Sequence, residues 1–196
     1  MDLFPRLYDW ALAPVEGMGL GALRRRLGDA LPAGPVLEIG VGTGLGLRAY
    51  TSHRVVGVDP QPFSLRRARS RARRWGVDFA PVQGDAQALP FPDASFPTVV
   101  SQLAFCTIPD PLRGLREVSR VLHPGGRFLA LEHVRHPSPP LSWLQRTATP
   151  LWKHIAGGCH LDRDTVRTIG EAGFHVLSLK RYLGGVLVMV VAIKPG

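Results

Sequence analysis

The sequence predicts an α/β fold in which parallel strands alternate with helices, and three observations support this class. A short apolar run at 35–37 leads into the glycine-rich stretch 38–44 and then into 45–50, which is a strand–loop–helix pattern. A second apolar strand ends in Asp59, and a third ends in Asp85. Polar residues at the carboxyl ends of neighbouring parallel strands are typical of sheets that bind nucleotide-like ligands.

The stretch Glu38-Ile39-Gly40-Val41-Gly42-Thr43-Gly44 predicts a loop whose backbone N–H groups approach a ligand closely. A dinucleotide-binding fingerprint requires glycines at positions 40, 42 and 45, but position 45 is Leu. Glu38 at the strand end would also repel a pyrophosphate and attract a cation. S-adenosylmethionine (SAM) carries a sulfonium and an ammonium group but no phosphate, so the loop favours SAM over NAD. Taken alone, such a loop is equally compatible with a structural turn.

Asp59 and Asp85 are candidates for binding the nucleoside part of such a cofactor. Asp59 follows the glycine loop at about the interval where Rossmann-like folds place an acid for the ribose hydroxyls. Asp85 could accept a hydrogen bond from an adenine amino group. Each acid alone is also explained as a helix N-cap or a solvated loop residue, but three acids at one sheet edge, Glu38 included, favour a ligand site.

Residues 35–132 together resemble the class I SAM-dependent methyltransferases of the ubiquinone/menaquinone-biosynthesis type. The family often has Asp where this chain has Pro97, just before the fourth strand, and a proline is tolerated as the first residue of a strand. The stretches that carry the resemblance are 38–44, 57–59, 84–86, 89–96 and 115–126.

The resemblance implies a role for each part of the site. Glu38 and the glycine loop would face the methionine part of SAM, Asp59 the ribose, and Asp85 with Ala86 the adenine. Tyr8 is a candidate lid residue over the cofactor, although packing of Tyr8 in the core is an equally good explanation. The full set of cofactor-binding candidates is Tyr8, Glu38, Gly40, Gly42, Thr43, Gly44, Asp59, Pro60, Gly84, Asp85, Ala86, Gln102 and Leu103.

The resemblance also implies the architecture: a single domain over 1–196 with a Rossmann-like, seven-stranded, mostly parallel sheet, helices on both faces and a C-terminal antiparallel hairpin. Residues 1–34 are expected to form an N-terminal helical cap. In that cap a helix would bury Leu20, Leu23, Leu27 and Leu31 and carry Arg24-Arg25-Arg26 outside.

The remaining elements are expected from their apolar patterns and their Pro and Gly residues. We expect one helix over 45–50 and another over 110–122, which Pro124-Gly125-Gly126 would end. A fifth strand is expected over 127–131, and the two strands of the hairpin over 174–181 and 186–193.

Residues 133–161 are the probable substrate segment because their His, Trp and Pro content departs from the surrounding composition. The apolar side chains of this segment would line a pocket or cover the sheet edge. Residues 157–165, Gly-Gly-Cys-His-Leu-Asp-Arg-Asp-Thr, resemble the branch of the family that acts on small thiols or lipid-like molecules. We therefore expect a small or lipid-like acceptor whose nucleophile is a thiol, hydroxyl or amine. The apolar residues concerned are Trp143, Leu144, Leu151, Trp152 and Ile155.

The expected chemistry is in-line displacement, in which alignment of the acceptor with the methyl group supplies much of the catalysis. A general base is needed only for an acceptor that keeps a proton at neutral pH. His133, which follows the fifth strand, is the first candidate and His160 the second. A histidine that merely bonds to backbone is an equal alternative for both. No spacing of ligands predicts a metal site.

The formal net charge of +9 is concentrated in Arg66–Arg74, on a helix whose Leu65, Ala68 and Ala72 share the inner face. A solvated basic face is the simplest interpretation. An anionic membrane surface is the alternative, and nucleic acid is disfavoured because aromatic residues do not interleave with the arginines. Ser101-Gln102-Leu103-Ala104 also lacks the signature of enzymes that methylate nucleic-acid amino groups.

Composition places the chain among globular proteins, with 45% hydrophobic and 20% charged residues. No basic-then-apolar leader opens it, and its longest apolar run, 184–193, is too short to cross a bilayer. Cys106 and Cys159 are expected to be reduced thiols of a cytoplasmic protein. An RNA- or protein-directed methyltransferase, a nicotinamide oxidoreductase and a SAM-binding protein without transfer activity stay open as alternatives.

Overall fold

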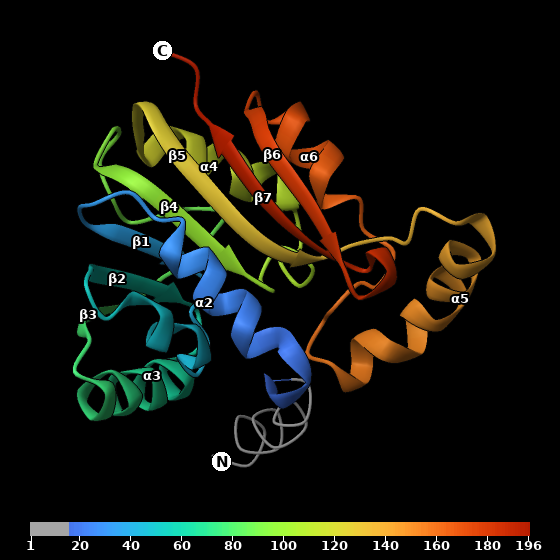
Figure 1. Ribbon diagram of the computed structural model, residues 1–196, viewed down its shortest axis with the longest axis horizontal. Coiled ribbons are helices and arrows are strands. Elements are labelled where there is room, and N and C mark those ends of the chain that lie inside the picture. The colour runs from blue at the N-terminus through green and yellow to red at the C-terminus, as the bar shows by residue number, and fades with distance from the viewer. Residues whose placement is uncertain (1–15) are drawn as a thin grey trace.

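The computed structural model describes residues 16–196, in which seven strands form one sheet with helices on both faces (Figure 1). The strands pair in the order β3-β2-β1-β4-β5-β7-β6. The expectations for Tyr8 and for the first 15 residues of the cap lie outside the described residues. The strands are β1 (Val36–Ile39), β2 (Arg54–Asp59), β3 (Asp78–Gln83), β4 (Phe96–Gln102), β5 (Leu122–His133), β6 (His175–Tyr182) and β7 (Leu187–Ile193).

The five strands from β3 to β5 pair in parallel, and β7 lies antiparallel between β5 and β6. The predicted mostly parallel sheet with its C-terminal hairpin is therefore confirmed. Strand β1 pairs with β2 on one side and β4 on the other, so the winding direction of the chain reverses there. Ligands of open α/β sheets bind outside the carboxyl ends of the strands at such a reversal.

Each face of the sheet is covered by its own helices. On one face lie α2 (Gly21–Asp29), the 3-10 helix η2 (Leu45–Tyr50) and α3 (Pro62–Trp75), which share an apolar cluster with alternate strand residues such as Val36 and Val100. On the other face, α4 (Pro111–Val121) and α6 (Thr165–Glu171) pack on Val99 and Phe128. This alternation is the two-residue period of a strand that is buried on both faces.

Helix α3 has the predicted orientation. Leu65, Ala68 and Ala72 are buried, and the chain leaves the helix through Gly76, whose φ of +67° is the left-handed conformation common after a helix. The arginines are not all outside: Arg67 and Arg71 are half-buried, and Arg71 Nη1 donates to the Thr43 carbonyl oxygen at 2.6 Å. The fully exposed arginines of the helix are Arg66, Arg69, Arg73 and Arg74.

Two expectations for the N-terminal region are wrong. Arg24 is buried rather than outside, because its guanidinium bonds to Glu16 Oε1 at 2.9 Å and to Gln102 Oε1 at 2.8 Å. Paired in this way, its charge tolerates burial. Helix α2 ends at Asp29, so Leu31 lies beyond it, and the π-helical turn η1 (Glu16–Leu20) precedes it.

One helix type and two boundaries also differ from expectation. Residues 45–50 form a 3-10 helix, η2, which starts directly after the left-handed Gly44 (φ +82°). Helix α4 ends at Val121, and β5 begins at Leu122, so Pro124-Gly125-Gly126 lies within the longer strand instead of separating two elements. The register of β4 and β5 shifts between Phe96 and Thr98, which accommodates the extra residues as a bulge.

Helix α5 (Pro139–Ile155) lies apart from both helical layers (Figure 1). It follows β5 and leads back to α6 through the loop 156–164. Within residues 16–196, no helix combines the length and the apolarity that crossing a membrane requires.

Candidate functional site

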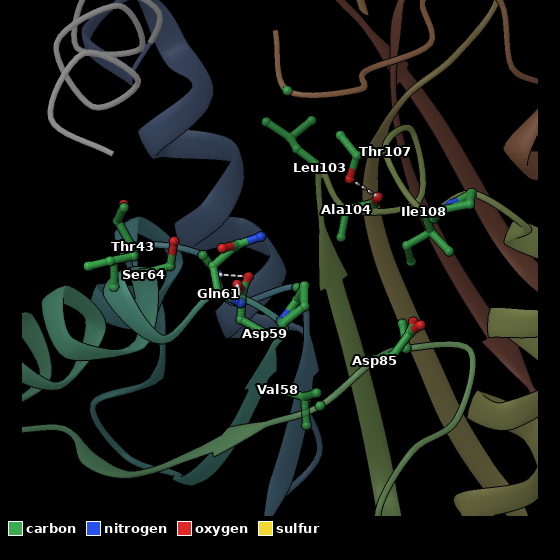
Figure 2. Close-up of a pocket in the computed structure, with 18 of the residues that line it drawn as sticks. Thr43, Val58, Asp59, Gln61, Ser64, Asp85, Leu103, Ala104, Thr107 and Ile108 are labelled. Atoms are coloured by element: carbon green, nitrogen blue, oxygen red, sulfur yellow. Dashed lines mark hydrogen bonds between the residues drawn. The ribbon is translucent and has the colours of Figure 1, made fainter. Parts of the chain in front are cut away.

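A cavity of about 590 Å³ opens at the carboxyl ends of β1, β2 and β4 (Figure 2). Asp59 faces it from the end of β2, and Asp85, in the loop after β3, faces it from the other side, near Ile108 (Figure 2). Leu103, Ala104, Thr107 and Ile108, which follow β4, line that other side. The sequence-predicted cofactor residues that line this cavity are Gly40, Gly42, Thr43, Asp59, Pro60, Gly84, Asp85, Ala86 and Leu103.

The glycine loop forms the floor of the cavity, and two of its glycines are required by close approach. A Cβ on Gly40 (φ +64°) would lie 2.5 Å from Ala104 Cβ, and one on Gly44 would lie 2.8 Å from Ala68 Cα. Real Cβ atoms do not approach that closely, so a side chain at either position would push the loop away from β4 or α3. The glycines therefore let the loop pass between β4 and α3.

The Asp59 carboxylate ties the glycine loop to the end of β2. Its Oδ2 accepts from the Gly42 backbone N–H at 2.9 Å, and its Oδ1 accepts from the Gln61 N–H at 2.9 Å. Burial raises the pKa of Asp59, while these two backbone hydrogen bonds oppose that rise. Each carboxylate oxygen has a second lone pair, so Asp59 can still accept hydrogen bonds from a ligand in the cavity.

Asp85 lies across the cavity from Asp59 (Figure 2). Its Oδ1 accepts from the Gln87 N–H at 2.8 Å, and both carboxylate oxygens accept from Gln87 Nε2 at 3.1 Å. The side chain is exposed, and Gly84 and Ala86 on either side of it also line the cavity.

A buried polar network lies below the glycine loop. Glu38 is 2% exposed, and its Oε1 accepts from Gln102 Nε2 at 3.2 Å. The Gln102 amide also bonds to the Tyr50 hydroxyl and accepts from Arg24. Burial raises the pKa of Glu38 to about 8, although Arg24 acts in the opposite direction. Among residues 16–196, Glu38 Oε2 has no hydrogen-bond partner.

A second buried carboxylate, Glu132, holds the turn that follows β4. Its Oε1 accepts from Ser101 Oγ and from the backbone N–H groups of Ala104 and Phe105, at 3.2 and 3.3 Å. Burial raises the pKa of Glu132 to about 7, and these hydrogen bonds oppose the rise. Because Ala104 lines the cavity, Glu132 fixes part of the cavity wall from behind.

The two cysteines meet beside this wall. Both are free thiols, and no disulfide joins them. A hydrogen bond between the two side chains raises the pKa of Cys106 and lowers the pKa of Cys159 to about 7. The His160 N–H donates to the Cys106 carbonyl oxygen at 2.8 Å, so the loop after α5 is tied to the turn after β4.

Neither predicted catalytic histidine lines the cavity. His133 ends β5, and burial lowers its pKa; its Nδ1 has no hydrogen-bond partner in the described part of the chain. His160 lies in the loop after α5, where burial, followed by Arg163, lowers its pKa. The cofactor candidates Glu38, Gly44 and Gln102 also lie outside the lining, beneath or beside the glycine loop.

The predicted substrate segment contributes little to the cavity. Of the residues that the structure fully describes in 133–161, Ala156 and Gly157 line it. The prediction that Trp143, Leu144 and Leu151 line a pocket or cover the sheet edge is wrong, because Trp143 is 65% and Leu151 70% exposed. Helix α5 instead presents these side chains to solvent.

Several lining residues were missed. Gln61, Phe63 and Ser64 come from the start of α3, and Thr107, Ile108 and Pro109 from the turn after β4. Their signal was positional: each group directly follows a strand whose carboxyl end was already assigned to the site.

Comparisons with known proteins agree with this geometry. The Methyltransferase domain profile matches residues 37–130. A thiol S-methyltransferase of Rattus norvegicus is 37% identical over 151 residues, which are 74% of this chain and 62% of that protein. A phosphatidylethanolamine N-methyltransferase of Cereibacter sphaeroides is 36% identical over 148 residues, which are 71% of this chain and 70% of that protein. The chain thus spans less than two thirds of the thiol methyltransferase.

The fold is also similar to solved structures of methyltransferases. The crystal structure of a SAM-dependent methyltransferase of Thermotoga maritima superimposes with a TM-score of 0.74 at 24% identity, over 97% of each chain. The family model matches residues 37–130, whereas this structural similarity covers nearly the whole chain. The chain belongs to the family of SAM-dependent methyltransferases.

Proposed function

We propose that the protein binds SAM in the cavity at the strand ends and transfers its methyl group to a small-molecule or lipid-like acceptor. The observation that carries this proposal is the convergence of the glycine loop, Asp59 and Asp85 on one cavity that Leu103 and Ala104 also line with apolar surface. The polar groups would fix the cofactor, and the apolar surface would receive the acceptor.

The residues present fit the cofactor. Glu38 lies beneath the glycine loop, and its buried Oε2 has no partner among the described residues; a cation in the cavity above would lower the raised pKa of Glu38 and favour its charged form. The loop at Gly42 places no side chain in the cavity, and Asp59 offers its remaining lone pairs to ribose hydroxyls. Ala86 and Ile108 supply apolar surface for an adenine ring.

Bound SAM supplies a methyl group that is already activated on a positively charged sulfur. The protein's own contribution is therefore to hold the acceptor in line and to exclude water. Leu103 and Thr107 border the space where the acceptor would lie. A thiol or amine acceptor agrees with the named activities of the relatives, and a proton must leave such an acceptor during the reaction.

His133 and His160 stay the candidates for removing that proton, although both lie outside the cavity lining. His160 is the better placed, because its backbone is bonded to Cys106 at the wall. Replacing each by Ala should lower kcat chiefly for acceptors that must lose a proton, leaving KM for SAM unchanged.

The exposed arginines of α3 support a further part of the proposal, an anionic membrane surface as a partner. Salt should then weaken vesicle binding in proportion to the number of arginines engaged.

The test has two steps. Titration calorimetry with SAM and with S-adenosylhomocysteine measures cofactor binding to the folded chain. Release of S-adenosylhomocysteine with thiols, quinols and phospholipids then measures transfer. Absence of SAM binding would overturn the proposal, and binding without transfer to any acceptor would leave a SAM-binding protein in its place.

A further inference from the structure

Helix α5 turns polar side chains toward the protein and large apolar side chains toward solvent. Its polar side faces the protein: Thr149 is 6% exposed and bonds to Asp162, and Gln145 accepts from the His136 N–H at 2.6 Å and donates to the Val134 carbonyl. The side turned to solvent carries Trp143, Leu144 and Leu151, with Thr147 and His154 among them. A helix at the surface of a globular protein normally turns its apolar side inward.

The outward side carries an apolar stripe, which we call the α5 stripe and define as Leu141, Leu144, Leu151 and Trp152. These positions are i, i+3, i+10 and i+11 of one helix, so they share a face. All four side chains are exposed, and exposed Trp143 flanks them. Contiguous apolar surface of this kind marks a site of interaction with a partner or a membrane.

The charges around the stripe indicate what it meets. Helix α5 carries Arg146, Lys153 and His154, all exposed, and no acidic residue. Exposed tryptophans and leucines flanked by basic residues are the composition of helices that lie in the interface of an anionic bilayer.

A second cavity, of about 250 Å³, lies at the start of α5, and basic side chains line it as well. Pro139 and Ser142 of the helix line it together with Arg135, His136 and Arg181. Its one acidic lining residue, Asp164, is already paired with Arg135 at 3.0 Å. Arginines in such a pocket suit a phosphate group.

We propose that α5 docks the protein on an anionic phospholipid bilayer, with the α5 stripe in the interface and its basic residues among the headgroups. A symmetric contact with a second copy fits less well, because a two-fold interface would bring the cations of α5 onto the same cations of the partner. The helix leads directly into Ala156 and Gly157 of the main cavity. Docking would therefore bring that cavity to the lipid surface, a consequence that rests on the proposed function.

The experiment is sedimentation of the full chain with vesicles of mixed phosphatidylglycerol and phosphatidylcholine, and with phosphatidylcholine alone. We expect sedimentation with the mixed vesicles at low salt. The variant Leu144→Gln/Leu151→Gln should partition at least about tenfold more weakly, because two exposed leucines lose their burial in the interface. The matched control is Leu177→Gln, an exposed leucine on the edge strand β6, which should bind as the wild type does.

Fluorescence quenching by brominated lipid locates the contact. Trp143 and Trp152 should be quenched, and the variant Trp143→Phe/Trp152→Phe should lose that quenching while still sedimenting. Circular dichroism and calorimetry with SAM confirm that each variant is folded, and they keep this test separate from that of the methyl-transfer activity.

Three results would overturn the proposal. The first is no sedimentation of the wild type with anionic vesicles. The second is sedimentation that Arg69→Gln/Arg73→Gln/Arg74→Gln on α3 abolishes and the α5 variant does not change. The third is a wild-type dimer, seen by analytical ultracentrifugation, that the α5 variant converts to a monomer without any effect of vesicles.

Discussion

The Asp59 carboxylate combines two tasks at the scale of a single residue: it fixes the glycine loop through Gly42, and it faces the cavity. We expect Asp59→Asn to weaken S-adenosylhomocysteine binding by about 2 kcal/mol, since hydrogen bonds to a charged group are lost and the new amide faces a backbone N–H. Titration calorimetry measures the change.

The matched control for that prediction is Asp78→Asn at the start of β3. Its carboxylate is exposed and comes no closer than 4.0 Å to Arg54. It lies at the amino end of β3, whereas the cavity lies at the carboxyl ends of the strands. It should leave affinity unchanged. Equal affinities of wild type and Asp59→Asn would remove Asp59 from the cofactor site.

Close packing between elements is sharpest where α2 crosses η2. A Cβ added to Gly28 would lie 2.2 Å from the Ala49 carbonyl oxygen, which is backbone and cannot rotate away. Gly28→Ala should therefore lower the free energy of unfolding by about 1–3 kcal/mol, as overpacking usually does. Urea unfolding followed by circular dichroism provides the measurement.

Gly170 in α6 is the counterpart of Gly28, because a Cβ there meets nothing within 4 Å. Gly170→Ala should raise the free energy of unfolding by about 0.5–1 kcal/mol through the higher helix propensity of alanine. If both substitutions shifted stability in the same direction, the close approach of α2 and η2 would not be the cause.

The elements differ in how far the sequence predicts them. Strands β1 and β2 are apolar because parallel strands are buried on both faces, so their positions and their acids, Glu38 and Asp59, were predictable. The apolar side chains of 133–161 were expected against the protein because of the composition of this segment, and composition does not reveal whether a neighbour covers them. Arg24 was misplaced because its partner Gln102 lies 78 residues away.

The residues around the cavity also differ in how far the sequence predicts them. Gly40, Gly42, Asp59 and Asp85 were found because each ends a strand or follows one directly. The roles of Glu132 and of the contact between the two cysteines depend on tertiary neighbours, which spacing along the chain does not reveal.

The stability of the whole molecule should depend on pH through two of its buried carboxyl groups, Glu38 and Glu132. Burial raises the pKa of Glu38 to about 8 and that of Glu132 to about 7, from 4.5. The folded state thus keeps protons that the unfolded chain releases, so stability should fall as pH rises from about 5 to about 8. Urea unfolding across this range tests the prediction.

Glu38→Gln/Glu132→Gln should flatten this dependence, because neither amide titrates. Glu171→Gln, which changes an exposed carboxylate on α6, should keep the wild-type slope. A steep decline that persists in the double variant would assign it to other groups.

The hydrogen bond from the His160 N–H to the Cys106 carbonyl joins the end of the α5 arm to the wall of the cavity. If α5 docks on a bilayer as proposed, this hydrogen bond would link the orientation of α5 to the turn after β4, which borders the space for the acceptor. Turnover of a lipid-like acceptor would then obey two-dimensional kinetics. Its rate would follow the surface density of acceptor in the bilayer and would fall by surface dilution when inert lipid is added at constant bulk concentration.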